Sequence, residues 1–140
     1  MRASDSLGIT QGLTSIPSRS GPKETMDRLE AEIRAQRMTV FARIDHTAGA
    51  AEAGLKLAPT ELIIFGNARG GTPLMQSVQT VGLDLPLKVL VWEDAAGKTW
   101  LSYNEPSWIA RRHSIANAKQ VVSKMAAALS AMARTAANPD

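Results

Sequence analysis

Apolar residues recur at two spacings along the chain, and each spacing predicts a different kind of element. Met26, Leu29 and Ile33 follow one another at helical spacing, with charged residues between them. They predict an amphipathic helix that has Pro22 in its first turn and ends near Arg37. Alternation and short apolar runs predict strands, which cover residues 7–16, 38–44, 61–66, 87–92 and 99–104.

Capping and turn residues place the remaining elements. Asp45 can accept a hydrogen bond at the start of a short helix over residues 46–53. Thr72 and Pro73 form a strong helix start, as N-cap and first helical residue, and predict a helix that runs to about residue 81. Asp94–Gly97 predict a hairpin turn. Two further helices are expected over residues 106–113 and 117–136.

The predicted order of elements is β-α-β-α-β-α-β-β-α-α, with helices between most strands and one tight hairpin. This order predicts the α+β class, as a two-layer sandwich in which helices pack on a mixed sheet of about five strands. No linker or internal repeat interrupts the chain, so we expect residues 1–140 to form a single domain.

The predicted sheet is apolar on both faces. Because side chains alternate along a strand, Val40, Ala42 and Ile44 are expected on one face, and Phe41 and Arg43 on the other. A sheet with one face in water alternates apolar and polar residues more regularly. We therefore expect a helix, a partner subunit or a ligand to cover the second face. Arg43 needs an acidic partner, a carbonyl group or a bound anion there.

The last predicted helix carries an apolar stripe with a spacing of three to four residues. Such a stripe fits packing on the chain's own sheet, and it also fits contact with a second subunit. Its members are Ile115, Ala118, Val122, Met125, Leu129 and Met132.

The amino-acid composition excludes several kinds of functional site. The 140 residues include no cysteine, which excludes disulfide scaffolds, cysteine nucleophiles and cysteine-ligated clusters. Only two histidines are present, and we expect neither a metal nor another cofactor. The apolar runs are far shorter than the roughly 20 residues that span a bilayer, so we expect a cytoplasmic protein without membrane contact. The net charge of +3 arises mainly in residues 106–140, which is too small and local a basic excess to predict nucleic-acid binding.

The segment Gly66–Thr72 lies between a predicted strand and a predicted helix start. Backbone N–H groups and the helix dipole favour an anion at such a position, and Arg69 could assist. The spacing of the glycines resembles a phosphate-binding loop, but the lysine that precedes the hydroxyl residue in that motif is missing, which argues against a nucleotide hydrolase. The alternative is a tight turn followed by a helix cap.

Asp45 and His46 form a second candidate. His46 could serve as a general base or a metal ligand at the rim of a pocket. Alternatively, Asp45 only caps the helix and His46 only packs or lies on the surface. A haem or metal held by His46 would need a second ligand, from Met75 or from another subunit.

A third candidate joins aromatic residues with a later group of cations. Arg111, Arg112 and His113 are expected in the last turn of the helix over 106–113, where they suit its dipole. The alternatives are that Arg111 or Arg112 binds a carboxylate or phosphate, or that the group contacts nucleic acid. The aromatic members of the group are Trp100, Tyr103 and Trp108.

Five segments together resemble the bacterial and archaeal family called domain of unknown function 302. They are TVFARIDH (39–46), PTELIIFGN (59–67), GTPLM (71–75), GLDLPLKVLVWED (82–94) and WLSYN (100–104). The resemblance covers about residues 10–115 and implies a small α+β sandwich that forms a homodimer. It supplies no catalytic residues, and the Ala-rich helical extension over 116–140 is predicted from its pattern alone.

The function expected from these observations is a small homodimeric binding module for a partly apolar, anionic small ligand. Buried aromatic walls with few polar groups are typical of such sites. We expect polar contacts from Arg43, His46, Asn67, Arg69 and Tyr103, and apolar walls from Phe41, Phe65, Met75 and Trp92.

Two other functions stay open at this point. An enzyme would use His46 as a base and Arg43 or Arg69 to stabilise an anion. A structural or protein-interaction subunit would fill the second sheet face with its partner. A binding module predicts a cavity beside Arg43, whereas an interaction subunit predicts no cavity.

Overall fold

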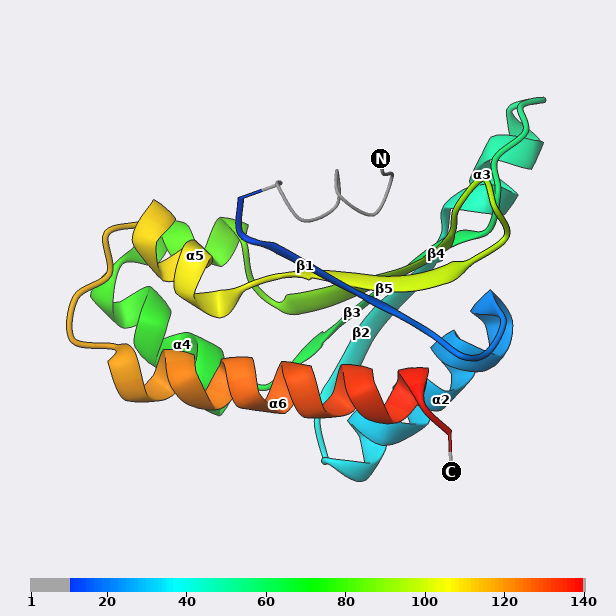
Figure 1. Cartoon of the computed structure of the whole chain (residues 1–140). Coiled ribbons are helices and arrows are strands. Elements are labelled where there is room, and N and C mark those ends of the chain that lie inside the picture. Colours follow the sequence, from blue (N-terminus) through cyan, green and yellow to red (C-terminus); the bar gives the residue numbers. More distant parts are fainter. Residues whose placement is uncertain (1–10, 140) are drawn as a thin grey trace.

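The computed structural model describes residues 11–139, and its elements follow the predicted order (Figure 1). The strands are β1 (Leu13–Pro17), β2 (Thr39–Asp45), β3 (Thr60–Gly66), β4 (Leu87–Glu93) and β5 (Thr99–Asn104). The helices are α2 (Pro22–Ala35), α3 (His46–Glu52), α4 (Ala68–Ser77), α5 (Pro106–Arg112) and α6 (Lys119–Ala137), with a short 3-10 helix, η1 (Gln79–Leu83), before β4. Residues 7–10 of the predicted first strand lie outside the described residues.

The α+β fold with one five-stranded sheet is confirmed, but the sheet is antiparallel throughout rather than mixed. The strand order is β1-β5-β4-β3-β2. A parallel pair needs a crossover helix that packs on the sheet face. Helix α3 buries no residue and extends beyond one end of the sheet, so β2 and β3 pair directly as antiparallel neighbours (Figure 1).

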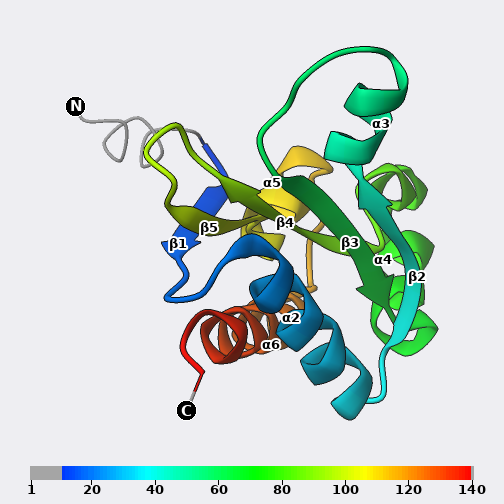
Figure 2. The same cartoon turned by 90° about the vertical axis from the view of Figure 1, so that its right-hand side faces the viewer.

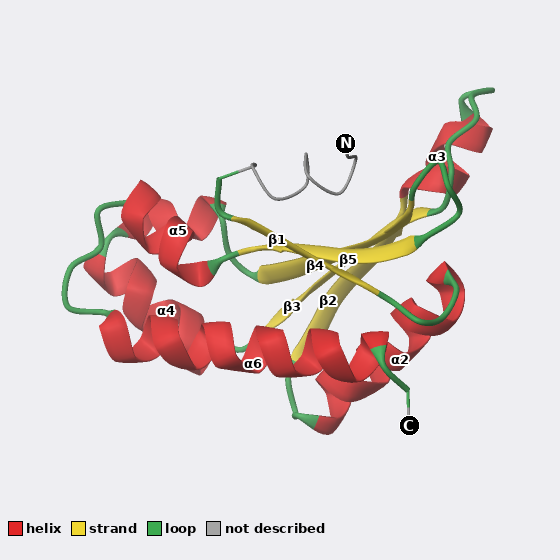
Figure 3. Ribbon diagram, in the orientation of Figure 1, coloured by secondary structure: helices red, strands yellow, loops and turns green. Residues whose placement is uncertain are grey.

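Helices α2 and α6 form the second layer of the sandwich, side by side on one face of the sheet (Figures 2 and 3). Met26, Leu29 and Ile33 of α2 are fully buried, as their spacing predicts. From α6, Leu129 and Met132 enter the same core, whereas Val122 packs in a second cluster with Leu74 of α4 and Ile109 of α5. The apolar stripe of the last helix is thus buried within the chain, partly on the sheet and partly against these helices. The side chain of Arg28 joins the two helices by donating to the carbonyl of Ala136 at 2.8 and 2.9 Å.

In the described part of the chain, no helix lies across the opposite face of the sheet, called here the open face (Figure 3). Leu62, Ile64 and Leu90 are only partly buried there, and Ile44 is 40% exposed. One strand departs from the predicted alternation. A β-bulge between Val40 and Ala42 turns Val40 into the core, while Ala42 stays on the open face, so these two residues do not share a face as expected.

Helix α4 begins earlier than predicted. Asn67, not Thr72, is its N-cap, and the Asn67 side chain accepts a 2.7 Å hydrogen bond from the N–H of Gly70. Pro73 therefore lies inside the helix rather than at its first position. The glycines at 70 and 71 belong to the first turns of the helix, so the segment after β3 is not an open phosphate-type loop.

Candidate functional site

A cavity of about 610 Å³ opens between α4 and α6, at the end of the sheet where β2 begins and β3 ends. The two helices and these strand ends form its walls. The lining residues are Met38, Phe41, Gly66–Thr72, Met75, Leu85–Leu87, Val121, Lys124, Met125 and Ala128.

The walls of the cavity are mainly apolar, and three methionines contribute to them. Met38 precedes β2, Met75 comes from α4 and Met125 from α6. Each thioether side chain has several rotatable bonds, so these walls can adjust to the shape of a ligand. Phe41, the bulged residue of β2, also lines the cavity and is 56% exposed.

Two cations lie at the cavity, one on each helix. Arg69 comes from the first turn of α4 and Lys124 from α6, and both side chains are exposed. Within residues 11–139, neither forms an ion pair or a side-chain hydrogen bond. The lining residues in the described part of the chain include no Asp or Glu. The N-terminus of α4, with its partial positive charge, opens on the same space. The electrostatic character of the cavity is therefore positive.

Of the nine residues predicted to contact a ligand, the structure brings four to this cavity. They are Phe41, Asn67, Arg69 and Met75. Asn67 already uses its side-chain oxygen to cap α4, which leaves its amide NH₂ group for other partners. The other five predicted residues lie elsewhere.

Arg43 is held by acidic side chains of the chain itself. It donates to Glu61 at 2.7 and 3.1 Å and to Glu30 at 2.9 Å, and its guanidinium lies 2.9 Å from Asp27. The bonds to Glu61 raise the pKa of Arg43 above its usual value, although partial burial acts against this. In turn, Arg43 and then Arg34 lower the pKa of Glu30. Arg43 thus has acidic partners within its own chain, one of the possibilities predicted from the sequence. It does not line the cavity.

His46 is the first residue of α3 and is exposed, at the opposite end of β2 from the cavity. Asp45 accepts a 2.9 Å hydrogen bond from the N–H of Ala48, which confirms it as the N-cap of this helix. His46 is not among the residues that line the cavity. The structure therefore does not join His46 with Arg43 or Arg69 around one space.

The last three predicted residues serve the core and the open face. Phe65 is fully buried under the helices, and Tyr103 is 6% exposed in the same core. Burial, the largest influence, raises the pKa of the Tyr103 hydroxyl. Trp92 lies on the open face, where it stacks on Trp100 with ring centres 6.2 Å apart and donates to Ser102 at 2.8 Å.

The contribution of α6 to the cavity was not predicted from the sequence. Val121, Lys124 and Ala128 form one wall, and only Met125 belonged to the predicted apolar stripe. A usable signal was present, because Lys124 is a cation directly beside that stripe. Because Lys124 is far from α4 in the sequence, its proximity to Arg69 could not be predicted.

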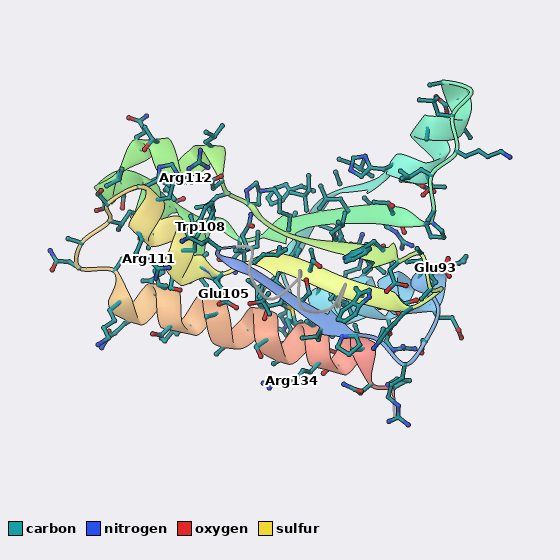
Figure 4. All side chains as sticks on the ribbon, turned by 45° about the horizontal axis from the view of Figure 1, so that its top comes forward. Glu93, Glu105, Trp108, Arg111, Arg112 and Arg134 are labelled. Atoms are coloured by element: carbon teal, nitrogen blue, oxygen red, sulfur yellow. The ribbon has the colours of Figure 1, made fainter. Side chains whose placement is uncertain are left out.

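A separate cluster joins η1 to the end of α5. Asp84 accepts two hydrogen bonds from Arg112, at 2.8 and 2.9 Å, and its Oδ2 lies 2.5 Å from Nε2 of His113. The other ring nitrogen of His113 lies 2.9 Å from Thr80 Oγ1. Arg112 also lies over the Trp108 ring, 5.9 Å from its centre, and Figure 4 shows both residues on α5. The carboxylate that Arg112 binds is thus one from its own chain.

Residues 11–139 contain no group of three or more His, Cys, Asp or Glu side chains that could hold a metal ion. None of the helices over the same residues combines the length and apolar character needed to cross a lipid bilayer.

The chain is similar to part of longer proteins. Fluoride-specific ion channel FluC 1 of Brucella suis biovar 1 (strain 1330) is 52% identical over 116 residues, which cover 83% of this chain and 46% of the relative. The protein of the same name from Brucella abortus biovar 1 (strain 9-941) is also 52% identical over 116 residues, which cover 43% of its length. The chain therefore spans less than half the length of these curated relatives.

A solved structure shares the fold. The crystal structure of an uncharacterized conserved protein DUF302 from Bacillus stearothermophilus matches 92% of this chain and 100% of its own, with a TM-score of 0.81 and 19% identity. The family model described as domain of unknown function DUF302 matches residues 14–132, which include most of α6. The resemblance noted in the sequence is thereby confirmed, and this chain belongs to the DUF302 family.

Proposed function

We propose that the chain is a homodimeric, cytoplasmic module that binds a partly apolar, anionic small molecule in the cavity between α4 and α6. The single observation that carries this proposal is the cavity itself. Its volume of about 610 Å³ lies within the range of roughly 300–1,000 Å³ typical of small-molecule sites. Its lining is also typical, with mostly apolar side chains and a few polar groups.

Binding without catalysis is the function that the arrangement supports best. A reaction needs a nucleophile or a proton-transfer group within hydrogen-bond reach of the substrate. From residues 11–139, the cavity lining holds Arg69, Lys124, Asn67 and Thr72 as its polar side chains, and no His, Asp or Glu. Such groups can hold and orient a ligand but are poorly suited to move a proton at neutral pH.

The Brucella relatives suggest where such a module could act. Their names describe fluoride-specific ion channels, and the match to this chain covers less than half of each. We propose that the matched part is a binding module that accompanies the channel function in those proteins. Fluoride itself fits this cavity poorly, because a small, strongly hydrated anion gains little from a large apolar space.

The proposal can be tested with the neutral apolar dye N-phenyl-1-naphthylamine, whose fluorescence rises in apolar surroundings. We expect saturable binding of one dye per subunit. Gly71 lies in α4 at the cavity, where an added Cβ would be 3.7 Å from both Leu85 Cδ1 and Met75 Cε. These are ordinary contact distances, so Gly71→Leu should fold while its larger side chain occupies the cavity.

The matched control is Gly49→Leu, which makes the same change within α3. Gly49 has nothing within 4 Å of an added Cβ, and α3 lies at the other end of the sheet. We expect Gly71→Leu to reduce dye affinity at least tenfold and Gly49→Leu to leave it unchanged. Absence of saturable binding, or equal affinity in the two variants, would refute the proposed cavity function.

A further inference from the structure

We infer that the ligand of the α4–α6 cavity is a single-chain amphiphile with an anionic head, such as a medium-chain carboxylate, bound with its head at the mouth. This inference rests on the proposed function and adds the chemical class and orientation of the ligand. It is argued from the distribution of polarity, charge and adaptable side chains around the cavity.

Polarity changes from the mouth of the cavity to its floor. Arg69 and Lys124 are exposed, whereas Gly66 and Leu87 at the ends of the central strands are buried. A ligand that matches this gradient has a charged end in contact with water and an apolar end inside. A small inorganic anion would leave the apolar floor unfilled, and a uniformly apolar ligand would leave the two cations without a partner.

The sign of the charge at the mouth is one-sided. The two cations come from opposite walls, and among the described residues no carboxylate lines the cavity to neutralise them. Within residues 11–139, neither cation has an ion-pair partner, unlike Arg43 and Arg112, which are held by acids of the chain. Only an anionic head complements this arrangement, while a cationic head would be repelled.

The interior favours a flexible chain over a rigid ring system. Met38, Met75 and Met125 approach from three different segments of the chain, and their thioether side chains can repack around an occupant of variable shape. Among the described residues, Phe41 is the only aromatic one in the lining, and it stands at the exposed edge of the sheet.

Three probes of equal chain length separate the contributions of head and chain: decanoate, decanol and decyltrimethylammonium. Each is titrated below its micelle concentration by displacement of the neutral dye. We expect decanoate to bind at least tenfold more tightly than decanol, and decyltrimethylammonium to bind more weakly than decanol. Raising the salt concentration should weaken decanoate binding and leave decanol binding nearly unchanged.

A double variant tests the assigned cations. Arg69→Gln combined with Lys124→Gln should lower decanoate affinity about tenfold and leave decanol affinity unchanged. The control is Arg111→Gln combined with Lys119→Gln, which removes the same charge from positions outside the cavity lining. We expect it to retain the wild-type preference.

The outcomes distinguish the inference from the function on which it rests. If decanol or decyltrimethylammonium binds as tightly as decanoate, the anionic head is refuted while the binding cavity stands. Equal loss of decanoate affinity in both double variants would refute the roles of Arg69 and Lys124. If neither the dye nor any of the three probes binds, the proposed function fails together with the inference.

Discussion

Arg43 Nε donates a 2.7 Å hydrogen bond to Glu61 Oε2 across the paired strands β2 and β3. The same guanidinium reaches Glu30 on α2, so one side chain ties the edge of the sheet to the helix layer. Arg43 lies on the sheet face that the helices cover, where its own chain supplies the acidic partners. The side chain therefore stabilises the fold, although the sequence suggested that it binds an external anion.

Replacement of Arg43 by Met should lower the free energy of unfolding by about 1–2 kcal/mol at pH 7, because Glu30 and Glu61 lose a shared partner. The effect should also depend on pH. Arg43 holds the pKa of Glu30 below its ordinary value of 4.5. The resulting stabilisation is complete above that value and is lost as the pH falls through the lower pKa of the folded state.

Urea unfolding at pH 7, 5 and 3 measures both effects. Arg43→Met should therefore lose less stability than the wild type between pH 5 and 3. Arg34→Met is a suitable control, because Arg34 is 60% exposed and pairs only with Glu30 among the described residues. A loss of the same size in the two variants would contradict the role assigned to Arg43.

The cluster around Asp84 predicts a difference between two neighbouring arginines. Arg112 binds Asp84 through two hydrogen bonds, whereas Arg111 has no such partner in the described residues. Both stand in the last turn of α5 and share its dipole. We expect Arg112→Gln to lower the free energy of unfolding by roughly 0.5–1 kcal/mol and Arg111→Gln to change it little. Chemical denaturation of the two variants checks this, and equal free energies of unfolding would refute a stabilising role of the Arg112–Asp84 pair.

Alanine substitutions at Gly12 and Gly97 separate the cost of backbone strain from the cost of a steric clash. Both have positive φ, +74° and +82°, so alanine is strained at each position. At Gly12 an added Cβ would also lie 2.2 Å from Trp108 Cγ, whereas at Gly97 it would meet nothing within 4 Å. Gly97→Ala should cost about 1 kcal/mol and Gly12→Ala roughly 2–4 kcal/mol. Thermal or urea unfolding would show the difference, and similar losses would mean that the Trp108 ring moves aside freely.

The open face is the surface on which we expect the second subunit. Leu90 lies on it between Leu62 and Ser102 in the registers of the neighbouring strands. Leu90→Glu should therefore convert a dimer of 15.0 kDa subunits into a monomer, as measured by sedimentation velocity. Leu83→Glu makes the same change at a residue that is 75% exposed on η1 and should not alter the sedimentation of the protein. A wild-type protein that sediments as a monomer would refute the homodimer.

Local signals in the sequence predicted most of the fold. The cap at Asp45, the Asp94–Gly97 turn and Pro106 at a helix start act over a few residues, and each stands where expected. The predicted start of α4 was wrong, because Thr72 and Pro73 form the stronger local motif in the sequence. In the structure Asn67 caps the helix instead. The prediction of a mixed sheet was wrong, because the sequence does not show whether a helix between two strands packs on the sheet and so joins parallel strands.

The candidate site was harder to predict, because it depends on contacts between distant segments. Arg69 was identified from its place at a helix start, but its counterpart Lys124 comes from another helix far along the chain. Arg43 was assigned to a ligand because the sequence does not show that Glu30 and Glu61 reach it. Residue types thus indicated the chemistry, while the partners required the three-dimensional arrangement.

The pairing of β1 with β5 has a consequence for the order in which the protein can assemble during synthesis. Leu13–Pro17 are synthesised before the other strands, yet within residues 11–139 their one strand partner is Thr99–Asn104, and the helix that completes the core follows later still. The growing chain therefore carries α2 with an unmatched apolar face until β4, β5 and α6 have been translated. The domain is expected to complete its folding only after α6 has left the ribosome, and nascent chains that stop before residue 99 should be targets for chaperones.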